Sequence, residues 1–269
     1  MCRNMTLPEL VRVLGWARQE GWNPGLDDGE AFFAADPEGY FLAEIEGKAA
    51  AAISVVNHDQ EHAFLGLYIC LPEFRGQGVG HALWRYALSH AGSRSVGLDG
   101  VPAQQANYEK SGFNRAGRTI RYKGNRMAAL AEDRLAEDAD LPRLIEADRR
   151  MVGYDRQRFL TSWFRPCGSR QTVVLGTYSY ATFRRCHEGI KIGPLHAPSG
   201  EEAMALLARC PKSLGDGPLY IDVPDRSPLE RLVRSLGYAP VFETARMVKG
   251  ARPTAKPPAY YSVATLELG

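Results

Sequence analysis

PEFRGQGVGHALW, residues 72–84, places three glycines within five positions behind an arginine and then continues as a helix-forming sequence. The residues before it, FLGLYICL at 64–71, are continuously apolar, which predicts a strand buried on both faces. After the glycines, apolar residues recur every three to four positions up to Gly92, which predicts an amphipathic helix. The order strand, glycine loop, helix decides the fold.

A glycine loop of this kind can bind an anion. The first amides of a helix lack hydrogen-bond partners, and the helix dipole adds about half a positive charge there. Two common phosphate loops do not fit. GxxxxGK[ST] fails because no Lys-Ser or Lys-Thr follows Gly80, and GxGxxG fails because His81 and Leu83 stand where its last glycine belongs. Neither a nucleotide triphosphatase nor a dinucleotide-binding fold is supported.

The elements expected around this loop alternate between helix and strand. They are a helix from about residue 6 to 21, a short helix at 30–35, strands at 40–46 and 49–56 joined by a two-residue turn at 47–48, the strand at 64–71, the helix after the loop, a strand at 95–99, a short helix at 104–110, and one or two strands at 113–122. Gly66 is expected to mark a bulge.

The pattern Arg75-x-x-Gly78-x-Gly80 after a strand resembles the acyl-CoA pyrophosphate loop of the GNAT superfamily of N-acetyltransferases. The order of elements over residues 1–126 is similar to the same fold. The resemblance implies an α/β fold with a central, mostly antiparallel mixed sheet flanked by helices, and acetyl-CoA as co-substrate without a metal. The cofactor-binding residues that it implies are Tyr68, Ile69, Cys70, Arg75, Gly76, Gln77, Gly78, Val79, Gly80 and His81. The alternatives are that the glycines only allow close helix-to-sheet packing and that Arg75 is a surface charge.

The resemblance also implies a proton donor for the leaving thiolate. The family uses a tyrosine four residues before a Gly-Phe pair, and Tyr108 stands four residues before Gly112-Phe113. A phenol with a pKa of about 10 is well matched to protonate a thiolate with a pKa of about 8.5. Tyr108 is therefore the predicted general acid, and the alternative is that its ring only packs in the core.

Other positions depart from the family pattern or leave the chemistry open. The family often has an asparagine seven residues before the tyrosine, whereas Val101 stands here and Gln104 or Gln105 could substitute. No general base is evident, since Asp99 before Gly100 fits a turn better than a base. Cys70, a thiol in an apolar strand, is expected to be inert rather than to carry an acyl group. Trp16 and Trp22 could line an acceptor pocket or simply pack.

The second half repeats the first in outline. LPELV at 7–11 recurs as LPRLI at 141–145, and Gly112-Phe113 recurs as Gly237-Tyr238. Two matches in the same order and at similar spacing predict a diverged duplication, with its joint near residues 131–140. The expected domains are a catalytic GNAT domain at 1–126 and a degenerate, non-catalytic GNAT-like domain at 127–269.

The second half lacks the features that bind coenzyme A in the first. Alignment of the repeat places residues 194–202 opposite residues 72–80, where the arginine and the glycine spacing are absent. Pro198 has no amide to donate, and Glu201 and Glu202 would repel a pyrophosphate. Val233, four residues before Gly237, cannot donate a proton. The second half is expected to cover the acceptor side or to support assembly.

Composition limits the remaining function classes. The 269 residues are 45% hydrophobic and 24% charged, which fits two globular domains, and a net charge of +2 argues against nucleic-acid binding. The absence of a signal peptide or an apolar span predicts a cytoplasmic protein without a membrane partner. The five cysteines form no CxxC pair, so no disulfide framework or zinc site is expected. The His and acidic residues of NHDQEH, 57–62, fit a solvated loop better than a metal site.

The sequence thus predicts an acetyl-CoA-dependent N-acetyltransferase that moves an acetyl group directly to a primary amine of a small molecule or peptide. A non-catalytic acyl-CoA-binding sensor or interaction protein is the alternative, and transfer of a longer acyl group is a third reading. The acceptor and the oligomeric state do not follow from the sequence, because loops shape acceptor pockets.

Overall fold

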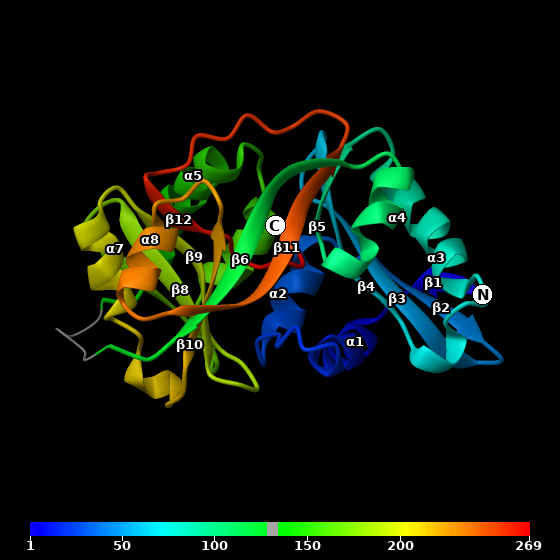
Figure 1. Ribbon diagram of the computed structural model, residues 1–269, viewed down its shortest axis with the longest axis horizontal. Coiled ribbons are helices and arrows are strands. Elements are labelled where there is room, and N and C mark those ends of the chain that lie inside the picture. Colours follow the sequence, from blue (N-terminus) through cyan, green and yellow to red (C-terminus); the bar gives the residue numbers. More distant parts are fainter. Residues whose placement is uncertain (128–133) are drawn as a thin grey trace.

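The computed structural model describes residues 1–127 and 134–269. In this part of the chain twelve strands form one mixed sheet, in the order β1-β2-β3-β4-β5-β11-β6-β10-β9-β8-β7, with β12 paired to β9. Helices flank the sheet, and the two long strands β6 and β11 run side by side through the middle of the molecule (Figure 1). The α/β class, with a mixed and mostly antiparallel sheet flanked by helices, is as predicted. None of the described helices is long and apolar enough to cross a bilayer.

The first half contains the expected elements in the expected order. A short strand that was not predicted, β1 (Cys2–Asn4), precedes them. The expected elements are α1 (Leu7–Gln19), α2 (Asp28–Ala35), β2 (Tyr40–Ile45), β3 (Lys48–Asn57), β4 (His62–Cys70), α3 (Val79–Leu88), β5 (Ser95–Gly100), α4 (Gln105–Lys110) and β6 (Asn114–Gly124). The expected turn at 47–48 is wrong by one residue. Ile45 pairs with Lys48, so the turn residues are Glu46 and Gly47, both with positive φ.

The second half has the same order of elements. It comprises α5 (Leu141–Val152), α6 (Gln157–Phe164), β7 (Arg170–Leu175), β8 (Ser179–Arg185), β9 (Ile190–Ala197), α7 (Gly200–Leu207), β10 (Leu219–Pro224), α8 (Leu229–Ser235), β11 (Ala239–Lys249) and, in addition, β12 (Tyr260–Ser262). Of the expected joint at 131–140, residues 131–133 lie outside the described residues.

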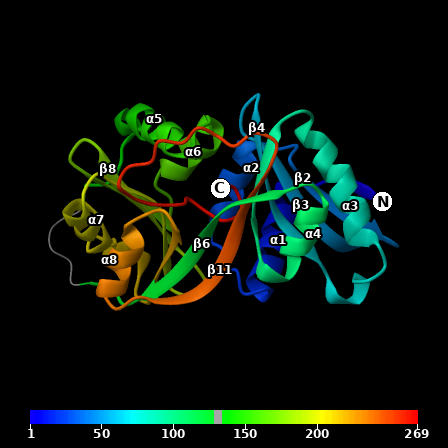
Figure 2. The same ribbon diagram turned by 45° about the horizontal axis from the view of Figure 1, so that its top comes forward.

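The two halves exchange their last strands. β5 of the first half pairs with β11, and β6 lies between β11 and β10 of the second half. The halves also share a hydrophobic core, in which Phe32 of α2 stacks on Trp163 of α6 with ring centroids 6.0 Å apart. The exchange carries side chains of β11 into the first half, and α6 of the second half lies next to α2 (Figure 2).

A bulge in β4 opens the sheet of the first half. Leu67 has a φ of +48°, and the pairing with β3 shifts there, next to Gly66 where the bulge was expected. β4 and β5 pair in parallel only from His62 to Leu65, so they diverge beyond that point. The prediction of a strand buried on both faces is wrong for this end of β4, because Gly66, Tyr68 and Cys70 line the opening and are only partly buried.

The corresponding opening in the second half is filled. β9 and β10 pair in parallel from Ile190 to Ile192, and β12 then pairs with β9 over residues 195–197. The amide of Val263, next to β12, donates to the carbonyl of Asp222 in β10. β12 thus takes the place that stays open between β4 and β5.

Candidate functional site

The glycine loop lies at the N-terminus of α3 with its amides exposed. Gly76 and Gly78 have φ values of +78° and +79°, and open space surrounds the position of a side chain at both. In the described part of the chain, none of the amides of residues 76–81 donates to a main-chain oxygen. The amide of Gly80 faces the sulfur of Cys70. This geometry fits the binding of a phosphate group.

Arg75 and Cys70 connect the loop to the elements around it. The Arg75 side chain donates from Nε to the carbonyl of Cys70 at 2.8 Å and from Nη2 to Glu20, at the end of α1, at 2.7 Å. The guanidinium group is half exposed, so both contacts can be exchanged for an anion. Burial raises the pKa of the Cys70 thiol above its ordinary value, which keeps the thiol protonated and unreactive.

A pocket of about 60 Å³ lies where β4 and β5 diverge; we call it the wedge pocket. It contains two of the residues predicted for the site, Tyr68 and Tyr108, whereas Ile69 is buried in the core below α1. Its lining comprises Trp22, Leu65, Gly66, Leu67, Tyr68, Leu98, Asp99, Val101, Gln104, Tyr108, Phe242, Thr244, Leu266 and Glu267.

Tyr108 points from α4 into the wedge pocket. Its ring stacks on Trp84 of α3 with centroids 5.5 Å apart. No protein hydrogen-bond partner for its hydroxyl is found among the described residues. Burial, with a smaller effect from Tyr68, raises the pKa of Tyr108 well above that of a free phenol. The phenol is therefore protonated at neutral pH and free to donate.

The glutamines that could replace the family asparagine lie differently. Val101 and Gln104 line the wedge pocket. The Gln105 side chain instead donates to the carbonyl of Gly100 at 3.0 Å and accepts from Arg115. Only Gln104 is therefore placed to contact a molecule in the pocket.

Asp99 is not a turn residue, contrary to the expectation. It lies inside β5, and its buried carboxylate accepts from Arg246 of β11 at 2.7 and 3.1 Å. Burial raises the pKa of Asp99, against the opposing effect of Arg246. The turn expectation assumed a strand ending at residue 99, but pairing with β11 extends β5 to Gly100.

The C-terminal segment, residues 263–269, supplies a second carboxylate that was not predicted from the sequence. Glu267 is buried, lines the wedge pocket and accepts a hydrogen bond from the hydroxyl of Thr265. A side chain at Gly66 would come within 2.2 Å of the Glu267 carbonyl oxygen, so a glycine is needed there. Phe242, Thr244 and Glu267 lie more than 130 residues from Tyr108, and no local pattern marks them as part of its site.

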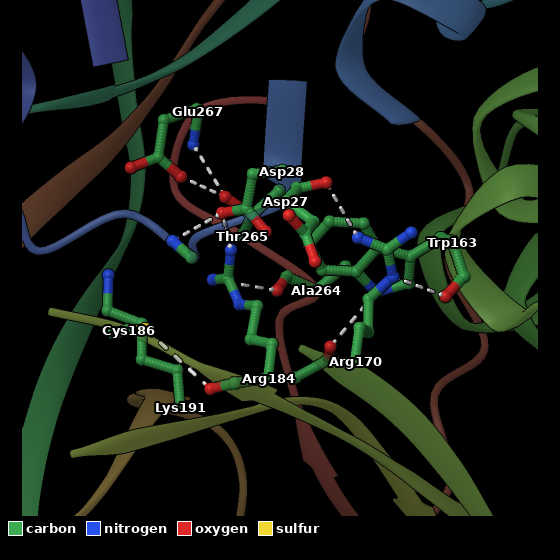
Figure 3. Close-up of polar contacts among 12 residues, drawn as sticks. Asp27, Asp28, Trp163, Arg170, Arg184, Cys186, Lys191, Ala264, Thr265 and Glu267 are labelled. Atoms are coloured by element: carbon green, nitrogen blue, oxygen red, sulfur yellow. Dashed lines mark hydrogen bonds and ion pairs between the residues drawn. The ribbon is translucent and has the colours of Figure 1, made fainter. Parts of the chain in front are cut away.

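β6 of the first half and β9 of the second half together hold the loop between α1 and α2, which carries Trp22. Arg121 and Lys191 both donate to the Trp22 carbonyl, at 2.9 and 2.7 Å, and burial lowers the pKa of Lys191 to about 8. Arg184 forms a buried ion pair with Asp28, close to Thr265 and Glu267 (Figure 3). Of the two tryptophans considered for the pocket, Trp22 lines it and Trp16 packs against the core.

The two histidines at 57–62 have different partners. His62 contacts Asp59 at 3.2 Å and stacks on Tyr154, whereas His58 Nε2 lies 3.0 Å from the carbonyl oxygen of Leu268. The expectation of a solvated loop is wrong for His58, because the C-terminal segment buries it. No group of three or more potential metal ligands occurs in the described ranges.

The helix start in the second half differs from α3. β9 continues through Ala197, so only Pro198 and Ser199 precede α7, and the hydroxyl of Ser199 caps the amide of Glu202 at 3.2 Å. The alignment with the glycine loop is therefore wrong for residues 194–197, which lie in β9, whereas Ser199 and Gly200 do stand at the start of the helix. Gly193 corresponds to Gly66, since each lies at the opening of its strand pair and approaches carbonyl oxygens of the C-terminal segment.

Comparisons with known proteins agree with this geometry. The family model "Acetyltransferase (GNAT) family" matches residues 7–113, and the model "Acetyltransferase (GNAT) domain" matches residues 144–261. The holothin acyltransferase of Pseudoalteromonas sp. (strain SANK 73390) is 33% identical over 98% of this chain and 92% of its own length.

Solved structures share the fold at lower identity. A structure from Pyrococcus horikoshii described as an acetyltransferase superposes over 100% of this chain and 95% of its own, with a TM-score of 0.83 and 21% identity. A tandem GNAT protein from the clavulanic acid biosynthesis pathway covers 95% of this chain and 99% of its own, with a TM-score of 0.65 and 14% identity.

Proposed function

The chain belongs to the GNAT family and is an acyltransferase, and from this premise we propose that it transfers an acetyl group from acetyl-CoA directly to a primary amine. The observation that carries the proposal is the wedge pocket, which has an unpaired phenol, Tyr108, on its wall. Tyr68, on the same wall, reaches the glycine loop, where a Cβ at Gly80 would lie 2.9 Å from the Tyr68 hydroxyl and where the amides of residues 76–81 have no main-chain acceptor among the described residues.

Each end of the cofactor has residues that fit it. The amides of Gly76 to His81 would hold the pyrophosphate, since a charge-assisted hydrogen bond contributes about 1.5–3 kcal/mol. Tyr68 and Cys70 lie along the path of the pantetheine arm on β4, where Ile69 would contribute main-chain groups only. When bound, acetyl-CoA supplies a thioester whose C–S bond breaks as the amine nitrogen takes the acetyl group.

Tyr108 is the proposed general acid. Burial keeps the proton on the phenol at neutral pH, and the same desolvation would raise the proton affinity of a thiolate that forms beside it, so that the thiolate takes the proton. An amine with a pKa of about 10.4 costs about 4–5 kcal/mol to deprotonate at pH 7. Asp99 is occupied by Arg246, so we propose that Glu267 orients the incoming ammonium group and receives its proton.

The acceptor that fits the wedge pocket is a small amine. The pocket has a volume of about 60 Å³, and its walls come from Trp22 on one side and Phe242 on the other. The holothin acyltransferase is named for the acylation of holothin. We assign catalysis to a domain at 1–126 and a supporting role to a domain at 127–269, which binds no coenzyme A and helps to hold the Trp22 loop.

The test is a panel of small amines assayed for release of free thiol from acetyl-CoA, followed by Tyr108→Phe. We expect kcat to fall by about 10² to 10⁴-fold, because a general acid contributes that much, while the Kd of acetyl-CoA is unchanged. Tyr86→Phe, on the exposed face of α3, is the matched control. An unchanged kcat in the Tyr108 variant would remove its proposed role, and no turnover with any amine would remove the acceptor class.

A further inference from the structure

A second cavity lies away from the wedge pocket. It is a cavity of about 250 Å³ between the two halves, at the N-terminal ends of β4 and β5. Strands β4, β5, β6 and β11 form its floor. Its roof is the segment 250–259, which crosses from the end of β11 to β12 (Figure 2). Apolar side chains supply most of its walls, among them Phe64, Met151, Tyr154, Val248, Pro253 and Tyr261.

Two deep arginines of this cavity already have carboxylate partners. Arg156 is fully buried and pairs with Asp148 at 2.7 Å, and Arg246 pairs with Asp99 at 2.7 Å. These pairs fix the shape of the floor and leave little net charge there. The deep part of the cavity therefore favours an apolar group.

Three further arginines, at the mouth of the cavity, have no close carboxylate partner in the described ranges. The closest carboxylate to Arg118 is Glu243 at 3.9 Å, and Arg252 donates to the main-chain oxygen of Arg115. Arg226 is exposed and has no hydrogen-bond or ion-pair partner among the described residues. Asp225 is the one acidic side chain in the lining. The mouth thus carries an excess of positive charge above an apolar interior.

The cavity is separate from the wedge pocket. Arg246 lines the cavity and its partner Asp99 lines the wedge pocket, so this ion pair lies between the two spaces. The C-terminal segment completes the division, with Gly269 facing the cavity and Glu267 facing the wedge pocket. A molecule in the cavity would not contact Tyr108.

We infer that this cavity binds a small organic anion with an apolar body. The body lies against Phe64, Tyr154 and Tyr261, and the oxyanion lies at the mouth, where guanidinium groups present paired N–H donors to a carboxylate or phosphate. Desolvation of the apolar body supplies affinity and the arginines supply selectivity for charge. The site is independent of the proposed acetyl transfer.

Calorimetric titration of the whole chain with 2-naphthoate, 2-naphthyl phosphate and the uncharged 2-naphthamide tests this inference. We expect at least one anion to bind at least tenfold more tightly than the amide, with the same Kd in the presence and absence of excess coenzyme A. The better of the two anions tells whether a carboxylate or a phosphate is preferred.

Variants locate the binding site. R226E/R252E should weaken anion binding at least tenfold, and Ala255→Phe in the exposed roof segment should block it by filling the space. R12E/R231E is the matched control, because it reverses two exposed arginines, on α1 and α8, whose side chains have no hydrogen-bond or ion-pair partner among the described residues, and it reaches the same net charge. Absence of binding, equal binding of the amide, displacement by coenzyme A, or equal loss in both double variants would overturn the inference.

Discussion

Gly66 is the position at which the C-terminal segment packs against β4 at the wedge pocket. An added Cβ would lie 2.2 Å from the Glu267 carbonyl oxygen, a main-chain atom that cannot rotate away. We expect Gly66→Ala to lower the free energy of unfolding by about 1–3 kcal/mol, the usual cost of overpacking. Chemical denaturation measures this. Gly15→Ala, in the exposed interior of α1 with open space around it, should instead stabilise the protein by about 0.5–1 kcal/mol. Equal effects of the two substitutions would contradict the close contact.

His58 makes the docking of the same segment depend on pH. Burial lowers the pKa of His58 to about 3, compared with about 6.5 in the unfolded chain. Between about pH 3 and pH 6.5, His58 is protonated in the unfolded state but not in the folded state. The free energy of unfolding is therefore highest above pH 6.5 and decreases as the pH falls below that value. Relative to His58→Gln, the wild type should lose about 2 kcal/mol between pH 6.5 and 5. Parallel stability curves for the two proteins, measured by denaturation at each pH, would exclude this effect.

Single residues also show which parts of the candidate site can be predicted from the sequence and which cannot. Tyr108 could be proposed because its spacing from Gly112-Phe113 is local and matches a family pattern. Glu267 could not, because it reaches the pocket only through the path of the C-terminal segment. Asp99 was misread, since a carboxylate before a glycine fits a turn unless a distant strand extends the pairing.

The two helix starts, at α3 and α7, should respond differently to coenzyme A. The amides of residues 76–81 have no main-chain acceptors, whereas Ser199 already caps α7. In hydrogen exchange read by mass spectrometry, we expect coenzyme A to slow exchange in peptides covering 72–82 and to leave those covering 197–206 unchanged. Protection of both segments would contradict a second half that binds no coenzyme A.

The elements were predicted well where their signals were local. Glycine spacing and apolar periodicity placed the loop and α3, and the repeat predicted the order of the second half. The alignment at residues 194–202 failed because the loop between strand and helix is shorter in the second half. Residues 71–78 separate β4 from α3, whereas only Pro198 and Ser199 separate β9 from α7, and short sequence matches do not show where a strand ends.

The whole molecule should not divide at the proposed domain boundary. A fragment 1–126 would retain β6 without β10 and β11, and its β5 would have an unpaired edge. We expect neither 1–126 nor 127–269 to give a cooperative thermal transition alone, and co-expression of the two to restore one. A cooperative transition in either isolated fragment, followed by circular dichroism, would show that the exchanged strands are not essential.

For the whole molecule, the sequence predicted two GNAT-like units but not the exchange of strands between them. β6 and β11 are long, similar strands, and each would fit the edge of either half equally well from its pattern alone. The exchange is a choice between two nearly equivalent pairings, which depends on the geometry of the joined halves.

The exchanged strands also bear on how such a gene can change over time. After a duplication, a copy that has lost its own chemistry is ordinarily free to decay or be deleted. Here the first half depends on the second half for strand β11, which pairs with β5 and places Arg246 next to Asp99. Selection on the reaction of one copy therefore maintains the other, and the pair is inherited as a single unit.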